Sequence, residues 1–218
     1  AGILDTLEET GQADNTIVVL WSDHGEFAGD HQLAEKYDTL MYDCLTHVPL
    51  IVRGPGVSRG AVSDAMIESV DLLPTIAELC GVETPGEVHG QSFHRCLEDP
   101  GHPHRDDVIA FGGYDVRTRG VISPAAENDP YYPKTQTAYA DPESMAQTLM
   151  LRSDRWKLIH RRVGVSELYD LEADPCELRN RHGAPSLLEV QSTLERRLLD
   201  RCLDAWTPVS PAFDAFPF

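Results

Sequence analysis

Basic residues are scarce in this sequence. Its 218 residues include 18 Lys and Arg residues against 36 Asp and Glu residues, which gives a formal net charge of −18. Such a charge repels the phosphates of nucleic acids and the surface of anionic membranes, so we expect neither as a partner. An anionic small molecule is also repelled at long range, and its site would need local positive charge from a metal ion or a lysine.

The sequence also lacks long apolar runs and paired cysteines. No segment has the roughly 20 apolar residues that a membrane-spanning helix needs. The five cysteines are odd in number and widely spaced, which gives neither a disulfide framework nor a zinc pattern. No Asn-x-Ser/Thr acceptor is present. The last two features favour a reducing compartment such as the cytoplasm, and localisation is otherwise undetermined.

The most informative segment is Ser22-Asp23-His24-Gly25-Glu26, which follows the apolar run 16–21. A β-branched run that ends in an acid and an imidazole predicts a buried strand with ligands at its C-terminal end. Asp23 and His24 are therefore candidate metal ligands. A carboxylate suits Ca²⁺, Mg²⁺ or Mn²⁺, whereas an imidazole is better tolerated by transition metals. The alternative is that Asp23 caps a turn and His24 is a surface histidine.

Two residues further along are candidates for the same site. His31 follows Gly29 and Asp30, and Lys36 lies thirteen residues after Asp23. One interpretation of Lys36 is a point charge that binds an oxygen of an anionic substrate; the other is a solvated lysine paired with Glu35. One interpretation of His31 is a substrate contact or an orienting hydrogen-bonding group; the other is a histidine that stabilises the loop.

These residues belong to a longer pattern that resembles the second metal-binding segment of the sulfatase family, within the alkaline phosphatase superfamily. The matching elements are Ser22–Gly25, Gly29–His31, Lys36 and the apolar strand Val48–Ile51. Residues 69–81 resemble a helix of the family, 90–93 one of its turns, and 152–159 and 167–175 two strands of its C-terminal subdomain. The chain is thus similar to the C-terminal half of a sulfatase.

The resemblance implies metal-assisted hydrolysis of a small-molecule sulfate monoester. It assigns Asp23 and His24 to the metal and Lys36 to the substrate, and His31 is kept as a candidate catalytic residue with both of its interpretations open. The implied metal is Ca²⁺, with Mg²⁺ or Mn²⁺ as alternatives, and two further acidic ligands are expected from an N-terminal half of the same enzyme. A phosphonate or phosphate ester is the alternative substrate, because tetrahedral oxyanions of sulfur and phosphorus use similar sites.

The nucleophile of the family is missing from this chain. Sulfatases carry Cys-x-Pro-x-Arg or Ser-x-Pro-x-Arg, whose first residue becomes formylglycine, and neither pattern occurs here. We expect the formylglycine in the N-terminal half, together with any signal peptide, and we expect this chain alone to be inactive. A catalytically silent fragment is a further alternative.

The expected fold class is α/β. Residues 1–105 alternate helix and strand, which predicts a mostly parallel sheet, and the resemblance implies part of an alkaline-phosphatase-like sandwich. Residues 106–218 are predicted to form a smaller subdomain with a long loop, an antiparallel sheet and a terminal helix over 186–203. Helices are expected at 3–11, 37–44 and 72–79, strands at 16–20, 50–52, 108–111, 148–152, 156–160 and 167–170, and the loop at 123–142.

Two other groups of residues have the composition of metal sites. His102 and His104 lie near Asp106 and Asp107, but without a cysteine or third histidine a surface loop is favoured over zinc. The acidic run 170–177 has Pro175 where a calcium loop requires glycine, so we expect an acidic turn between the last strand and the terminal helix.

Overall fold

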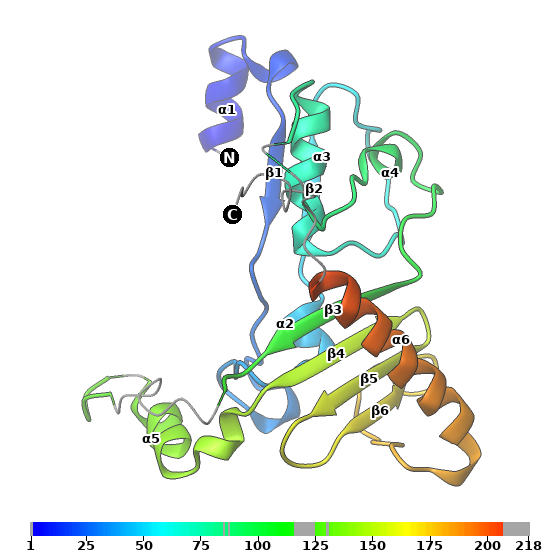
Figure 1. Ribbon diagram of the computed structural model, residues 1–218. Helices are drawn as coiled ribbons and strands as arrows, with labels where there is room; N and C mark the ends of the chain where they lie inside the picture. The colour runs from blue at the N-terminus through cyan, green and yellow to red at the C-terminus, as the bar shows by residue number, and fades with distance from the viewer. Residues whose placement is uncertain (1, 85, 87, 116–124, 130, 207–218) are drawn as a thin grey trace, which may run out of the picture. The chain divides into compact units, whose positions relative to one another are not determined.

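The computed structural model describes residues 2–84, 86, 88–115, 125–129 and 131–206 (Figure 1). The chain divides into two compact units. The first contains residues 1–23, 48–106 and the end of the chain from 204, and the second contains residues 24–47 and 107–203. None of the helices in the described residues is long and apolar enough to cross a membrane.

The first unit contains a two-stranded sheet and several helices. Its elements are α1 (Gly2–Glu9), β1 (Val18–Trp21), β2 (Leu50–Arg53), η3 (Ser69–Asp71), α3 (Leu72–Leu79) and α4 (His94–Glu98). The helices predicted at 3–11 and 72–79 and the strands predicted at 16–20 and 50–52 are therefore confirmed, with ends that differ by at most two residues.

The strands of this unit pair in the opposite sense to the one we expected. β1 and β2 are antiparallel, with Val18 opposite Arg53 and Trp21 opposite Leu50. A parallel pair is usually joined through a crossover helix that packs on the sheet, but the described connection between these strands has only the short helices η2 (Asp30–Gln32) and α2 (Asp43–Thr46). The prediction of parallel pairing is wrong for these two strands.

The second unit contains a four-stranded antiparallel sheet. Its order is β3 (Asp107–Gly112), β4 (Thr148–Ser153), β5 (Trp156–Arg161) and β6 (Glu167–Asp170), each strand next to its neighbour in the chain (Figure 1). The helices of the unit are α2, α5 (Tyr132–Ala140) and α6 (Leu188–Trp206). All four predicted strands of residues 106–218 are confirmed.

Both faces of this sheet are covered. On one face, Leu151 and Leu158 form a buried cluster with Leu198 of α6. On the other face, Met150, Ile159 and Tyr169 pack with Met41, which precedes α2, and with Leu171. Because side chains alternate along a strand, neighbouring residues of β5 face opposite clusters. The segment that contains the candidate site residues therefore supplies the cover for the face opposite α6.

Three expectations for this unit differ from the structure. The helix predicted at 37–44 is wrong, because Met41 packs on the sheet from an extended segment and α2 begins only at Asp43. The loop predicted at 123–142 contains α5, which starts next to Pro133, a residue suited to the first helical turn; positions 123, 124 and 130 lie outside the described residues. The terminal helix starts at Leu188, with Ser186 inside a preceding 3-10 turn.

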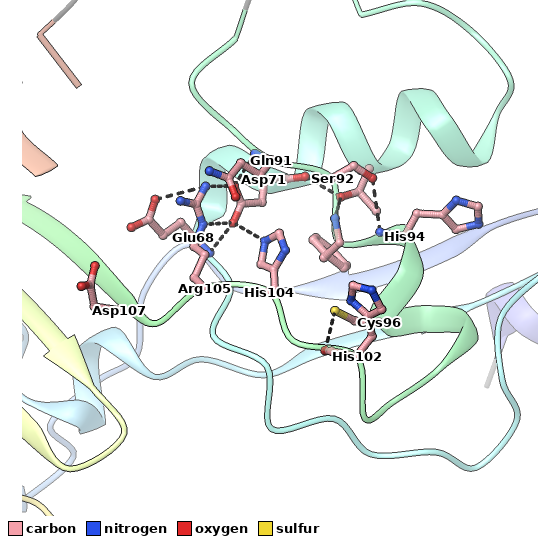
Figure 2. A network of polar contacts seen from close by, with 12 residues as sticks. Glu68, Asp71, Gln91, Ser92, His94, Cys96, His102, His104, Arg105 and Asp107 are labelled. Atoms are coloured by element: carbon pink, nitrogen blue, oxygen red, sulfur yellow. Dashed lines mark hydrogen bonds and ion pairs between the residues drawn. The ribbon is translucent and has the colours of Figure 1, made fainter. Parts of the chain in front are cut away.

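A buried acid organises the first unit (Figure 2). Asp71 is fully buried at the end of η3, and its carboxylate accepts the backbone N–H groups of Glu68 at 2.9 Å and Gln91 at 2.7 Å. Arg105 binds the same carboxylate through Nε at 2.8 Å and through Nη2. Burial acts to raise the pKa of Asp71, but these hydrogen bonds outweigh it and hold the pKa below its usual value.

His104 joins the same group of residues. Its Nε2 lies 3.2 Å from Asp71 Oδ2, and its side chain is buried (Figure 2). The surface-loop interpretation of the 102–107 segment is therefore wrong for His104, which takes part in the packing of the first unit. Within the described part of the chain, no three His, Cys, Asp or Glu side chains gather as a metal site.

Candidate active site

Two of the predicted site residues contact each other in the second unit. Lys36 Nζ contacts His24 Nε2, twelve residues away in the chain, and both side chains are half-buried. The other ring nitrogen of His24, Nδ1, lies 2.8 Å from the carbonyl oxygen of Gly25. A carbonyl oxygen can only accept, so Nδ1 carries the proton and the neutral ring presents a lone pair at Nε2. That lone pair accepts from the Lys36 ammonium.

The backbone next to His24 is fixed by close packing on α2. The N–H of Gly25 donates to the carbonyl oxygen of Leu45 at 2.8 Å. A Cβ added to Gly25 would lie 2.0 Å from the carbonyl oxygen of Cys44, so no other residue fits without moving one of the two segments. The glycine of the Asp-His-Gly motif is thus required by contact with α2, a constraint that its sequence position did not reveal.

The contacts of Lys36 differ from those expected of a solvated lysine paired with Glu35. No ion pair joins Lys36 to Glu35 among the described residues, and the Lys36 ammonium contacts His24 instead. Its backbone carbonyl accepts a hydrogen bond from Lys134 Nζ at 2.8 Å, and Lys134 also lies 5.1 Å from the ring centre of Tyr37. Lys134 of α5 therefore helps to hold the segment that contains Lys36 in place.

The contacts of His31 are aromatic. Its ring stacks on Tyr42 at 4.0 Å between centroids and meets Phe27 edge-on at 6.0 Å. Its backbone has a positive φ of 50°, which non-glycine residues rarely adopt. These are the contacts expected of a histidine that stabilises the loop, and a role in substrate binding stays a prediction.

Asp23 and His24 are consecutive residues that belong to different units. Asp23 is exposed and follows β1 as the last residue before the boundary, and His24 begins the second unit. A carboxylate and a neutral imidazole are ligand types that divalent cations accept, but Ca²⁺ takes six to eight ligands. The described residues contain no group of three such side chains, so the assignment of Asp23 and His24 to a metal stays a prediction.

Comparison with known proteins identifies the group to which the chain belongs. The sulfatase family model matches residues 1–82, and the model for the C-terminal region of N-sulphoglucosamine sulphohydrolase matches residues 123–203. The chain belongs to the sulfatase family. Among its curated relatives are arylsulfatase K of Xenopus laevis, 30% identical over 202 residues, and N-acetylglucosamine-6-O-sulfatase of Bacteroides thetaiotaomicron, 32% identical over 199 residues.

Solved structures agree with this assignment. A protein solved in complex with its substrate D-glucosamine-2-N,6-O-disulfate is 29% identical, with a TM-score of 0.71 over 93% of this chain and 37% of its own. The phosphonate monoester hydrolase SpPMH of Silicibacter pomeroyi gives the same identity, TM-score and coverages. These neighbours support the predicted sulfatase-type α/β fold.

The chain spans only part of the length of these relatives. It spans 34% of arylsulfatase K and 32% of the Bacteroides enzyme, although 91% and 90% of its own length takes part in the matches. This agrees with the prediction that the chain corresponds to one part of a longer hydrolase.

Proposed function

We propose that this chain supplies part of the metal and sulfate site of an enzyme that hydrolyses sulfate monoesters. The observation that carries the proposal is the contact between Lys36 Nζ and His24 Nε2, because it brings a cation and a metal-type ligand together from two points of the predicted motif. In this proposal Asp23 and His24 bind the divalent cation, and Ca²⁺ is the expected ion, with Mg²⁺ or Mn²⁺ as alternatives.

Each residue has a separate chemical task in this site. The bound cation would neutralise charge on the oxygens of the sulfate ester. The proton on Nδ1, held by the Gly25 carbonyl, leaves the lone pair of His24 at Nε2, where the cation would bind in place of the Lys36 ammonium. Lys36 would bind a substrate oxygen on which negative charge increases in the transition state. Local positive charge is needed here, because the formal net charge of −18 opposes the approach of an anion.

The remaining parts of the site are proposed to come from an N-terminal half. They are the formylglycine nucleophile and the acidic ligands that complete the coordination of the cation. Relatives named as arylsulfatases and as a glucosamine sulfatase support a small sulfate ester as the substrate, with its alcohol part unassigned.

A phosphonate or phosphate monoester is the second candidate substrate. A phosphonate monoester hydrolase is among the similar structures, and the multifunctional alkaline phosphatase superfamily protein PehA of Trinickia caryophylli is 30% identical over 184 residues. A site built from a divalent cation and a lysine binds either tetrahedral oxyanion, so the residues of this chain do not separate the two.

The test is a paired assay on a complete protein that contains this chain. Hydrolysis of an aryl sulfate and of the matching aryl phosphonate monoester is measured before and after removal of divalent cations with a chelator. We expect the sulfate to be the better substrate by kcat/KM, and both reactions to stop with the chelator and return with Ca²⁺ or Mn²⁺. Absence of hydrolysis of either substrate in the metal-loaded protein would refute the proposal, and a preference for the phosphonate would favour the second candidate.

A further inference from the structure

Lys157 is a buried base that the proposed reaction does not use. It lies on β5 and its side chain is fully buried. Its Nζ donates to Asp43 Oδ1 at 2.5 Å and to the carbonyl oxygen of Met41 at 3.0 Å. The same atom lies 2.7 Å from Glu177 Oε1, an ion pair without hydrogen-bond geometry. Arg152 Nε lies 3.3 Å from Asp43 Oδ1, so two acids and two bases balance in charge.

Glu177 binds the same helix at a second point. Its Oε2 accepts the backbone N–H of Asp43 at 2.6 Å, at the first residue of α2. Glu177 is almost fully buried and has a positive φ of 54°, a conformation that non-glycine residues rarely adopt. A backbone held in such a conformation is over-determined by its surroundings, so the position of this carboxylate is well specified.

The group formed by Lys157, Asp43 and Glu177 is connected to His24 by a short series of contacts. Asp43 begins α2, whose Leu45 carbonyl accepts the N–H of Gly25 at 2.8 Å. The carbonyl of Gly25 in turn holds Nδ1 of His24 at 2.8 Å. No side chain intervenes between Gly25 and α2, as the 2.0 Å approach of a built Cβ to the next carbonyl shows.

We propose that Lys157 is a positioning residue for the candidate site. Its ion pairs with Asp43 and Glu177 hold α2 on the sheet, and through α2 they hold the backbone and ring of His24 where it meets Lys36. This role rests on the proposed function of His24 as a metal ligand. A buried ion pair is a poor source of stability compared with apolar side chains of similar size, so a precise position is what Lys157 contributes here.

The first test measures hydrogen exchange of backbone amides in the 218-residue chain with Lys157→Met. Methionine keeps most of the length of the side chain but removes the ammonium from both acids, which leaves Asp43 its ion pair with Arg152 and Glu177 its hydrogen bond from the Asp43 N–H. We expect exchange at the Gly25 and Asp43 amides to become roughly tenfold faster relative to the Met150 amide in β4. If this variant does not fold, Asp43→Asn takes its place, since it removes the same ion pair with little change of shape. Unchanged relative exchange in the folded variant would overturn the proposal.

A matched control is the next residue of the same strand. Leu158 is as buried as Lys157 but faces the cluster with α6, so Leu158→Ala weakens the sheet without touching α2. This control is expected to speed exchange throughout the unit while the ratio of Gly25 to Met150 stays at its original value. A change of that ratio in the control equal to the change in Lys157→Met would mean that general destabilisation is the cause, and would refute a positioning role.

The second test measures the affinity for Mn²⁺ and the steady-state kinetics of a complete protein that contains the chain. Lys157→Met or Asp43→Asn is expected to bind Mn²⁺ about 10- to 100-fold more weakly, as for other residues that orient a ligand. With saturating Mn²⁺, kcat for an aryl sulfate should fall while KM changes little. Faster exchange at Gly25 with unchanged Mn²⁺ affinity would refute the positioning role and leave the proposed function intact. Failure of the unaltered protein to bind Mn²⁺ or hydrolyse the ester would refute both.

Discussion

The two units each contain a buried group of ion pairs, and the two groups differ in what they connect. In the first unit a buried acid, Asp71, is surrounded by donors no more than 34 positions away in the chain. In the second unit a buried base, Lys157, reaches Asp43 and Met41 across 114 and 116 positions. The first group holds η3 against residues that are close to it in the chain. The second attaches the segment with the candidate ligands to strand β5, which is far from it in the sequence.

This difference shows that burial and charge alone do not identify a functional group. Asp71 has the more complete set of hydrogen bonds, with a bidentate arginine and two backbone donors, and its own partners among the described residues are not candidate site residues. The group around Lys157 has a less complete set of hydrogen bonds, because Oε1 of Glu177 lacks one. The residues to which a buried group is connected indicate more about its role than the completeness of its own hydrogen bonds.

The largest effect is expected from the residue that would touch the substrate. In a complete protein that contains this chain, Lys36→Ala should lower kcat for an aryl sulfate by about 10²- to 10³-fold, the usual loss for a donor to developing negative charge. The circular dichroism spectrum and the unfolding midpoint should stay close to those of the original protein. An unchanged kcat would remove Lys36 from the site.

Replacement of Asp71 should affect stability and not the site segment. Asp71→Asn removes the buried carboxylate that binds Arg105 through two nitrogens, while the longer ion pair with Glu68 at 3.7 Å remains; breaking a buried pair costs about 3 to 5 kcal/mol of unfolding free energy. Urea unfolding of the 218-residue chain measures this loss. Under folding conditions the relative exchange of the Gly25 amide should not change. A shift there equal to that in Lys157→Met would erase the distinction between the two groups.

Acid should weaken the chain through the buried carboxylates of both groups. Burial acts to raise the pKa of Asp43, but the charge and hydrogen bond of Lys157, with Arg152, outweigh it and hold the pKa below its usual value; the pKa of Asp71 is also lowered. A lowered folded-state pKa contributes stability that is complete above the unfolded value of about 3.9 and is lost as the pH falls through the folded value. Unfolding free energy should therefore drop below about pH 4.

Substitution of Asp71 provides the check on this pH dependence. Asp71→Asn lacks one of the two titrating groups, so its unfolding free energy should fall less steeply over the same acid range, as measured by urea unfolding at several pH values. An equal slope in both proteins would exclude Asp71 as a source of the acid sensitivity.

The smallest effect is expected at an exposed pair on the same sheet. Arg155 at the turn before β5 donates to both carboxylate oxygens of Asp170, at 3.0 and 2.7 Å, but its side chain is exposed. Surface ion pairs contribute little because water screens them. Arg155→Ala should leave the urea midpoint and the exchange of Gly25 unchanged, and a clear loss at either would show that exposed charges also support the site segment.

The sequence predicted the regular elements where apolar alternation was strong. The four strands of the second unit and α3 have the expected positions, because their spacing matches the period of the element. The 37–44 helix failed because Met41 and Tyr42 pack on a sheet more than a hundred positions away, and local periodicity contains no information about such a partner.

The candidate site was predictable as a motif and not as a set of contacts. The spacing of His24 and Lys36 singled them out, but the burial of Lys157 was missed, because a lysine in a strand is normally solvated. One signal was available: Ile159 shares its strand face and is apolar, which indicated that this face is covered as well. Glu177 was assigned to an acidic turn, and its long-range contact with Asp43 has no local signature.

The most direct test of the central claim is a calorimetric titration with Ca²⁺ and Mn²⁺ of a complete protein that contains this chain, alongside its Asp23→Asn/His24→Ala variant. We expect one bound cation in the original protein and a loss of affinity of at least about 100-fold in the variant, with the fold retained. Equal affinity in the two proteins would contradict it, because the cation would then be bound without the two residues from which the proposed site is built.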